Sequence, residues 1–471
     1  MNYYKSFVIL IATSIGFLYG YDILLMKFVM LIDYFRIYFG LNSEPTIDLI
    51  LSTVIVIGGI VGSIIAGILG DSKGRKNTLL YGVILMLLGY IINALSFHIS
   101  IFILGRLFIG LAIGLTSSVC PVYLSEIVLE TQRCISSGIY FSMMIIGMVA
   151  SFLINYSLLY NHFYNVNDWN DFHDNSFLQW RLFFYFPMIV CFLLISGVYF
   201  LPETPRWLSY NQFNNDAMTI FMKLEKSSNS DDHDIQEKYN TIQDLSAIHR
   251  SRGPPSFTDF FKSGIRRRTM SVLFLSTFQQ WHVIGILSYL CNILLMIMGI
   301  PKRTALLTII LFYIAAIIIF SSMMFTFLAD KFGRQKILLK GAMAIVLLIT
   351  LKRLSELRNC TPSGYLFIMY IIIVYTVFSF GSWRCIPWLY KAEIFPLRYK
   401  TKGSAIGSIA QYINSALILL LIPEMATMNK FIVFGIFFVG TFLSSVVLYF
   451  TEETKRLTLE QIENNTFRDK I

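Results

Sequence analysis

Long runs of apolar residues, rather than amphipathic stripes, dominate this chain. A run of about 20 apolar residues is long enough to cross the hydrocarbon core of a bilayer as a helix. The pattern predicts an all-α membrane protein with about twelve such helices. We place them at residues 6–26, 49–70, 79–98, 101–125, 135–159, 180–200, 270–298, 304–328, 337–354, 365–390, 403–423 and 428–450.

Polar residues concentrate in one long interruption after the sixth run. Residues 201–268 are charged and polar, with a few apolar positions at helical spacing, and they predict short cytosolic helices. We therefore expect four parts along the chain. These are an N-terminal six-helix half (1–200), a cytosolic helical linker (201–268), a C-terminal six-helix half (269–450) and a cytosolic tail (451–471).

The two halves repeat each other at three places. The repeated segments are LGDSKGRKN (69–77) with LADKFGRQK (328–336), YLSEIVLETQR (123–133) with YKAEIFPLRYK (390–400), and PETPR (202–206) with EETKR (452–456). Because the three pairs recur in the same order, they predict an internal duplication. Duplicated, pseudo-symmetric halves favour a transporter with its binding site between them and alternating access by rocking.

The repeats also predict a gate at the cytosolic end. Their aspartates can cap a helix or accept from an arginine, and their glycines allow tight turns. We expect Glu126 to pair with Arg133, and Glu393 with Arg398 or Lys400, when that end is closed. The alternative is that these charges only flank the helices on the cytosolic side. The candidate gate residues are Asp71, Gly74, Arg75, Glu126, Arg133, Asp330, Gly333, Arg334, Glu393, Arg398 and Lys400.

Composition and charge agree with a membrane protein. The chain is 56% hydrophobic and only 14% charged, whereas a soluble domain carries roughly 25% charged residues. Lysines and arginines follow the second, eighth and tenth runs, while the loop NHFYNVNDWNDFHDNSF after the fifth has none. This distribution predicts that both termini are cytosolic. The net charge of +10 is then explained by loop orientation and anionic lipid, without nucleic acid.

Sequence motifs of enzymes are missing from the chain. It has no P-loop, no zinc-ligand spacing and no nucleophile elbow. We therefore expect neither an enzyme nor an ATP-driven pump, and no cofactor or metal.

Several segments, taken in order, resemble the sugar porter family of the major facilitator superfamily. They are GFLYGYD, GDSKGRK, PVYLSEI, PETPRWL, the pair Gln279-Gln280, ADKFGRQ and PWLYKAEIFPLRYKTKG. The resemblance implies a twelve-helix transporter for hexoses or related polyols. It implies substrate contacts from Gln279, Gln280 and Trp388, and it places Gln411 where the family has a binding-site asparagine.

The resemblance also gives a role to two charged residues within apolar runs, Asp22 and Arg106. In proton-coupled members of the family the aspartate accepts the proton and the arginine modulates it. Ionisable side chains at membrane depth usually pair and usually matter. The alternative is a permanent structural ion pair, shared with Lys27.

The predicted pocket departs from the family more than the scaffold does. Phe141, Gly285 and Ile318 stand where the family has amides, and Arg384 stands where it has a glycine or proline. A sugar site needs groups that both donate and accept hydrogen bonds, so this pocket is less suited to hydroxyls and more suited to an anion. Arg384 either binds substrate beside Trp388 or snorkels to the cytosolic end.

These observations predict a secondary-active or facilitative transporter of a hexose or related small polar solute, with or without proton coupling. Two alternatives stay open: a carrier of an organic anion or other non-sugar metabolite, and a non-transporting nutrient sensor. The expected partners are the solute, protons and the lipid bilayer, and the expected location is the plasma membrane.

Overall fold

The computed structural model describes most of the chain. The described residues are 3–30, 32–41, 46–165, 180–225, 232–262, 264–298, 304–357, 374–375, 377–427, 430–449, 451–455 and 457–462. Within these ranges the regular structure is helical, which confirms the predicted all-α class.

Six long helices follow the first six apolar runs. They are α1 (Tyr3–Met30), α3 (Thr46–Ser72), α4 (Arg75–Ala94), α5 (Ile99–Ile127), α6 (Arg133–Asn165) and α8 (Leu182–Tyr199), with the short α2 (Asp33–Tyr38) after α1. Helix α5 packs against both α3 and α4, and α1 packs against α6. Glycine permits the close α3–α5 approach, because a Cβ atom at Gly62 or Gly110 would collide with a backbone carbonyl of the other helix.

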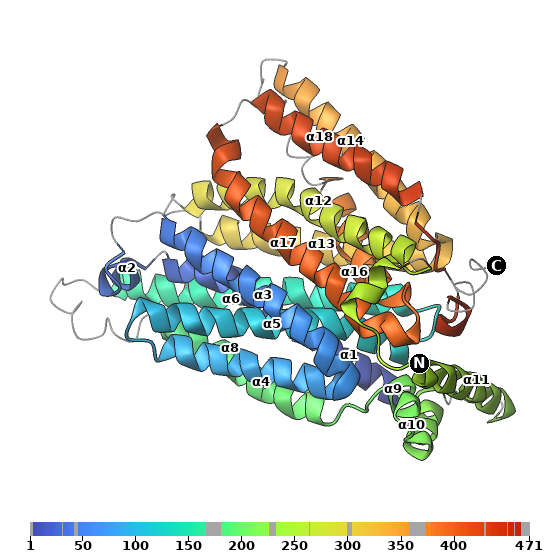
Figure 1. Ribbon diagram of the computed structural model, residues 1–471. Helices are drawn as coiled ribbons and strands as arrows, with labels where there is room; N and C mark the ends of the chain where they lie inside the picture. Colours follow the sequence, from blue (N-terminus) through green and yellow to red (C-terminus); the bar gives the residue numbers. More distant parts are fainter. Residues whose placement is uncertain are drawn as a thin grey trace.

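Within the described residues, the second half has five further long helices. They are α12 (Arg266–Met298), α13 (Thr304–Phe332), α14 (Arg334–Leu357), α17 (Lys400–Thr427) and α18 (Lys430–Tyr449). Helices α14 and α18 lie side by side, on the side of the molecule away from α4 and α8 (Figure 1). Contacts of α17 with α3 and α5, and of α13 with α6, join this half to the first.

The predicted tenth span, 365–390, lies largely outside the described residues. Its described end is a π-helical turn, Ser379–Arg384, followed by α16 (Ile386–Glu393) and a 3₁₀ turn at Leu397–Tyr399. Within the described ranges, eight helices are long and apolar enough to cross a membrane. They are Tyr3–Met30, Ile50–Ser72, Arg75–Ala94, Ile99–Ile127, Arg133–Leu158, Leu182–Tyr199, Ala315–Phe332 and Leu397–Leu421.

The middle segment forms short helices at one end of the bundle (Figure 1). They are α9 (Pro205–Tyr210), α10 (Asn214–Glu225), α11 (Asp232–Ser251) and a 3₁₀ turn at Phe257–Phe261. The start of α1 lies at the same end, where Lys5 is 3.9 Å from Glu225 of α10. Residues 451–462 reach it too, since Glu460 contacts Arg206 of α9.

Candidate functional site

Asp22 of α1 and Arg106 of α5 form a buried ion pair. An Arg106 guanidinium nitrogen lies 2.8 Å from Asp22 Oδ1, and the side chains are 2% and 3% exposed. Lys27 is exposed and makes no ion pair with Asp22, so the predicted sharing of the pair with Lys27 is wrong. Tyr90 of α4 lies within electrostatic reach of both charges, and its buried hydroxyl has no partner among the described residues.

The helix break before α16 exposes backbone groups, and Gln279 satisfies one of them. The π-turn disturbs the regular hydrogen bonds, and Pro387 has no N–H to donate. Gln279 Nε2 donates to the Arg384 carbonyl at 2.7 Å. The amide nitrogen of this predicted substrate ligand is therefore engaged by the backbone, and its carbonyl oxygen is left for a solute.

Trp388 lies between the two halves in a group of aromatic rings. It stacks on Tyr140 of α6, with ring centroids 4.3 Å apart and planes at 18°. It also meets Phe141 edge-on, with centroids 5.5 Å apart. From α17, Tyr412 completes this layer and shares a 2.8 Å hydrogen bond with Ser117 of α5. The tryptophan is thus buried between the halves and does not act as an interfacial anchor.

Arg384 is buried beside the aromatic rings. Its guanidinium carbon lies 5.8 Å from the centre of the Phe141 ring, and the residue is 7% exposed. Its guanidinium makes no ion pair with a described acid, and the Nε atom has no hydrogen-bond partner among the described residues. Neither terminal nitrogen is among the fully buried atoms without a partner, so substrate binding and snorkelling both stay predictions for Arg384.

Two other amides and one lysine adjoin this group. Gln280 and Gln411 are buried, and neither side chain hydrogen-bonds to a described residue. Lys391 is 1% exposed, and its Nζ lies 2.6 Å from Ser408 Oγ. The sequence interpretation missed this lysine. Its position seven residues after Arg384, about two helical turns on and on the same face, was the available signal.

At the end of the bundle where the linker helices lie, two buried glutamates pair across the halves. Glu126 lies 3.4 Å from Arg75 in its own half and 4.0 Å from Lys400 in the other. Glu393 lies 3.3 Å from Arg334 in its own half and 3.9 Å from Arg133 in the other. The expected pairs Glu126–Arg133 and Glu393–Lys400 are therefore wrong, because the two cations are exchanged.

Arg398 also differs from the prediction. Its guanidinium donates to the carbonyl oxygens of Gly253 at 2.7 Å and Arg252 at 2.9 Å, so it ties the linker to the second half and does not pair with Glu393.

The loop aspartates of the repeat reach toward the other half as well. Asp330 accepts from the backbone N–H groups of Cys134 and Ile135, at 3.3 and 3.2 Å, where a negative charge suits the start of α6. Asp71 lies near Thr401, at the start of α17. Each aspartate therefore faces a helix N-terminus of the opposite half.

Gly74 and Gly333 turn the chain between helices with φ of 95° and 113°. These are backbone conformations that only glycine adopts readily. A Cβ atom at either position would also meet a carboxylate, Glu203 or Glu453.

Glu203 and Glu453 are residues that the sequence interpretation missed. Glu203 accepts from the backbone N–H groups of Arg75 and Lys76 at the start of α4, and Glu453 accepts from those of Arg334 and Gln335 at the start of α14. The available signal was their matching place in PETPR and EETKR.

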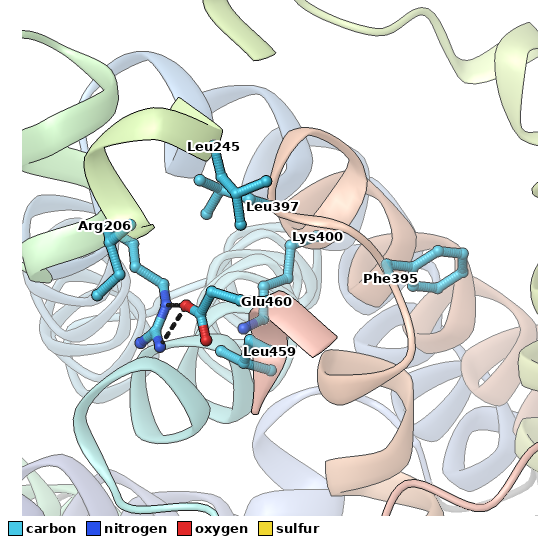
Figure 2. A pocket seen from close by; sticks show the side chains of 8 residues that line it. Arg206, Leu245, Phe395, Leu397, Lys400, Leu459 and Glu460 are labelled. Atoms are coloured by element: carbon cyan, nitrogen blue, oxygen red, sulfur yellow. Dashed lines mark hydrogen bonds and ion pairs between the residues drawn. The ribbon is translucent and has the colours of Figure 1, made fainter. Parts of the chain in front are cut away.

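One more pair joins the linker to the segment after α18. Arg206 Nε and a terminal guanidinium nitrogen donate to Glu460 Oε1 at 3.0 and 2.8 Å. The two side chains point toward each other in a small pocket that Lys400 and Leu245 also line (Figure 2). Burial alone would raise the pKa of Glu460, but the Arg206 charge outweighs it and lowers that pKa to about 2.

This lowered pKa gives a prediction for Glu460→Gln. A carboxylate whose folded pKa lies below its unfolded value stabilises the fold above the unfolded pKa, and loses that contribution as pH falls toward the folded one. The melting temperature of Glu460→Gln should therefore lie below wild type by a constant amount between pH 8 and pH 5.5, and the difference should shrink only under more acidic conditions. Glu237→Gln, at an exposed position on α11, is the control. A difference that vanishes already at pH 6 would contradict this assignment.

Comparison with known proteins identifies what this arrangement resembles. The family model described as "Sugar (and other) transporter" matches residues 8–465. The glucose transporter GlcP of Staphylococcus epidermidis is 27% identical over 98% of this chain and 96% of that protein. The galactose-proton symporter of Escherichia coli K12 is 25% identical over 98% of this chain and 95% of its own length.

Solved structures show the same fold. The proton:xylose symporter XylE, bound to 6-bromo-6-deoxy-D-glucose, aligns with a TM-score of 0.83 at 20% identity, over 98% of this chain and 99% of its own. The inward-open form of XylE aligns with a TM-score of 0.65 over 98% of this chain and 100% of its own. The fold is therefore that of the major facilitator superfamily, as the sequence predicted.

Proposed function

Since this chain belongs to the family of sugar and other transporters, we propose that it carries a hexose or a related small polar solute across the membrane by alternating access, coupled to protons. The observation that carries the proposal is the set of contacts that close one end of the molecule. These contacts are Glu126–Lys400, Glu393–Arg133 and Arg206–Glu460. The first two join one half to the other, and the third joins the linker to the C-terminal tail, so a solute can leave at that end only after the first two break.

The closed end defines one of the two states that alternating access requires. A bistable arrangement responds to a ligand according to the difference in affinity between its two states. The buried charge pairs favour the cytosol-closed state, and a solute bound between the halves must offset them before the molecule opens inward.

Asp22 and Arg106 are the proposed proton-coupling residues. Protonation of Asp22 removes one charge of the buried pair and frees Arg106, whose Nε already has no partner among the described residues. A group that releases its partner on protonation can tie proton binding to a movement of α1 against α5.

The proposed solute site lies where Trp388 and Tyr140 stack. The aromatic faces suit the C–H surfaces of a sugar ring, while the side chains of Gln280 and Gln411 offer both donors and acceptors. The Gln279 carbonyl oxygen adds a further acceptor. Arg384 brings a charged group to this site.

The proposal also covers orientation. We place the protein in the plasma membrane with both termini and the linker 201–268 in the cytosol, between halves 1–200 and 269–450. A cysteine at Glu237, introduced in a background with Cys360→Ser, should react with an impermeant maleimide only after the cells are permeabilised. Ready labelling of intact cells would contradict this topology.

Uptake into proteoliposomes tests the function itself. The purified protein should accumulate at least one radiolabelled monosaccharide from a panel of hexoses, pentoses, polyols and organic acids when the outside is acidic. If organic acids enter and no monosaccharide, neutral or charged, enters, the alternative of a non-sugar carrier is correct. If no solute of the panel enters or exchanges, the sensor alternative is favoured.

A further inference from the structure

Two cations are buried in the second half without a matching acid. Arg384 is 7% exposed and Lys391 is 1% exposed. Neither forms an ion pair with a described residue, and the one described partner of Lys391 is the neutral hydroxyl of Ser408. Burial, and then the positive charge of Arg384, lower the pKa of Lys391 to about 7.

The sequence of this half contains no acid that could serve them at that depth. Residues 260–329 contain no aspartate or glutamate. Between 330 and 451 the acids are Asp330, Glu356, Glu393 and Glu424, all near helix ends. Asp330 and Glu393 are already engaged in the cytosolic gate.

The first half offers no partner either. Its acid within the core of the membrane helices, Asp22, is held at 2.8 Å by Arg106. Among the described residues, no acid neutralises the positive charge at this site.

An unpaired buried guanidinium is unfavourable, and the ring beside it compensates only in part. Contact with the face of Phe141 stabilises the cation by about 0.5–2 kcal/mol, but it satisfies none of the five N–H donors of the guanidinium. Loss of hydration for an isolated charge costs several kcal/mol. A ligand anion would supply both the missing charge and the missing acceptors.

The surroundings hold the guanidinium in place for such a ligand. Gln279 fixes the Arg384 carbonyl at 2.7 Å. Phe141, under the guanidinium, meets Trp388 edge-on, and Trp388 stacks on Tyr140. The Arg384 guanidinium therefore lies at the edge of the aromatic surface proposed to bind the sugar ring.

From this geometry we propose that the preferred substrate is an anionic monosaccharide, whose carboxylate or phosphate group binds Arg384 while its ring lies against Trp388. The proposal rests on the proposed function as a sugar transporter and narrows its substrate class. A planar guanidinium matches the two oxygens of either anion in a bidentate contact. Lys391 adds positive charge behind Arg384 and favours the same ligand.

The test is competition against exchange of a labelled sugar in proteoliposomes at pH 7. The unlabelled competitors are glucose, glucuronate and glucose 6-phosphate. Their inhibition of exchange is measured for the wild-type protein, for Arg384→Gly and Arg384→Lys, and for the control Lys340→Gln, whose lysine is exposed on α14. In wild type and the control, one of the two anionic sugars should compete about ten- to a hundred-fold better than glucose. Which anion does so distinguishes a carboxylate site from a phosphate site.

Arg384→Gly should lose this preference, so that neither anionic sugar competes better than glucose in this variant. Arg384→Lys keeps the positive charge but lacks the planar guanidinium that binds two oxygens at once. This variant should retain only part of the anion preference. Should Arg384→Gly fail to fold, the shift of the wild-type melting temperature by each sugar gives the same ranking.

Each outcome separates the two proposals. Equal competition by glucose and both anionic sugars in wild type, or an anion preference that survives in Arg384→Gly, overturns the inference and leaves sugar transport intact. If neither neutral nor anionic monosaccharides are transported and another solute is taken up, the proposed function is overturned as well.

Discussion

Replacing Glu393 with alanine is expected to slow transport by about a hundred-fold and leave the order of substrate preference unchanged. Glu393 is fully buried and accepts from Thr454 at 2.9 Å, besides its contacts with Arg334 and Arg133. Its removal leaves two arginines without this acid. Breaking a buried pair in this way costs about 3–5 kcal/mol, and each 1.4 kcal/mol is about a factor of ten in a population.

The loss falls mainly on the cytosol-closed state, because the Arg133 contact exists only when the halves meet at that end. Uptake rates for a solute panel and labelling of a cysteine at the cytosolic end, with and without solute, measure the two effects. Glu393→Gln keeps the side-chain volume and should slow transport less than the alanine variant. Glu237→Ala on α11 is the control for a lost exposed charge. Unchanged rates, or a reordered substrate preference, would show that Glu393 does not act as a gate.

Asp22→Asn is expected to abolish accumulation driven by a pH gradient while exchange of solute across the membrane continues. Asparagine resembles the protonated acid in shape and charge, so the variant behaves as a carrier that is permanently loaded with its proton. Exchange needs only movement of the loaded form, whereas net accumulation needs the proton to leave. Uptake with an acidic exterior and exchange at equal pH measure the two activities separately.

The control for this variant is Asp216→Asn, at an exposed acid on α10. A melting temperature for each protein identifies any loss of folding caused by leaving Arg106 without its partner. If wild-type uptake itself ignores the proton gradient, the pair is structural and the coupling proposal is wrong.

The helices could be predicted from sequence because their signal is local. A long apolar run is sufficient to place α1, α5 or α13, and the repeated loops at Gly74 and Gly333 require glycine for a backbone reason. The Asp22–Arg106 contact was also predictable, since two opposite charges within apolar helices favour each other strongly.

The gate partners could not be predicted in the same way. The exchange of Arg133 and Lys400 between Glu393 and Glu126 depends on how two rigid halves meet, and residue spacing within one half contains no information on that. The π-turn before α16 could not be predicted either, because no distinctive sequence signal marks it. Arg384 is the last residue of this turn, so its direction could not be predicted.

Sugar-dependent proton movement is the most direct test of proton-coupled transport. Proteoliposomes that contain a pH-sensitive dye, with no pH gradient imposed, should acidify inside when an inward sugar gradient is applied. Asp22→Asn should exchange labelled sugar across the membrane without acidification. Downhill sugar entry by the wild-type protein with no change of internal pH would contradict the account.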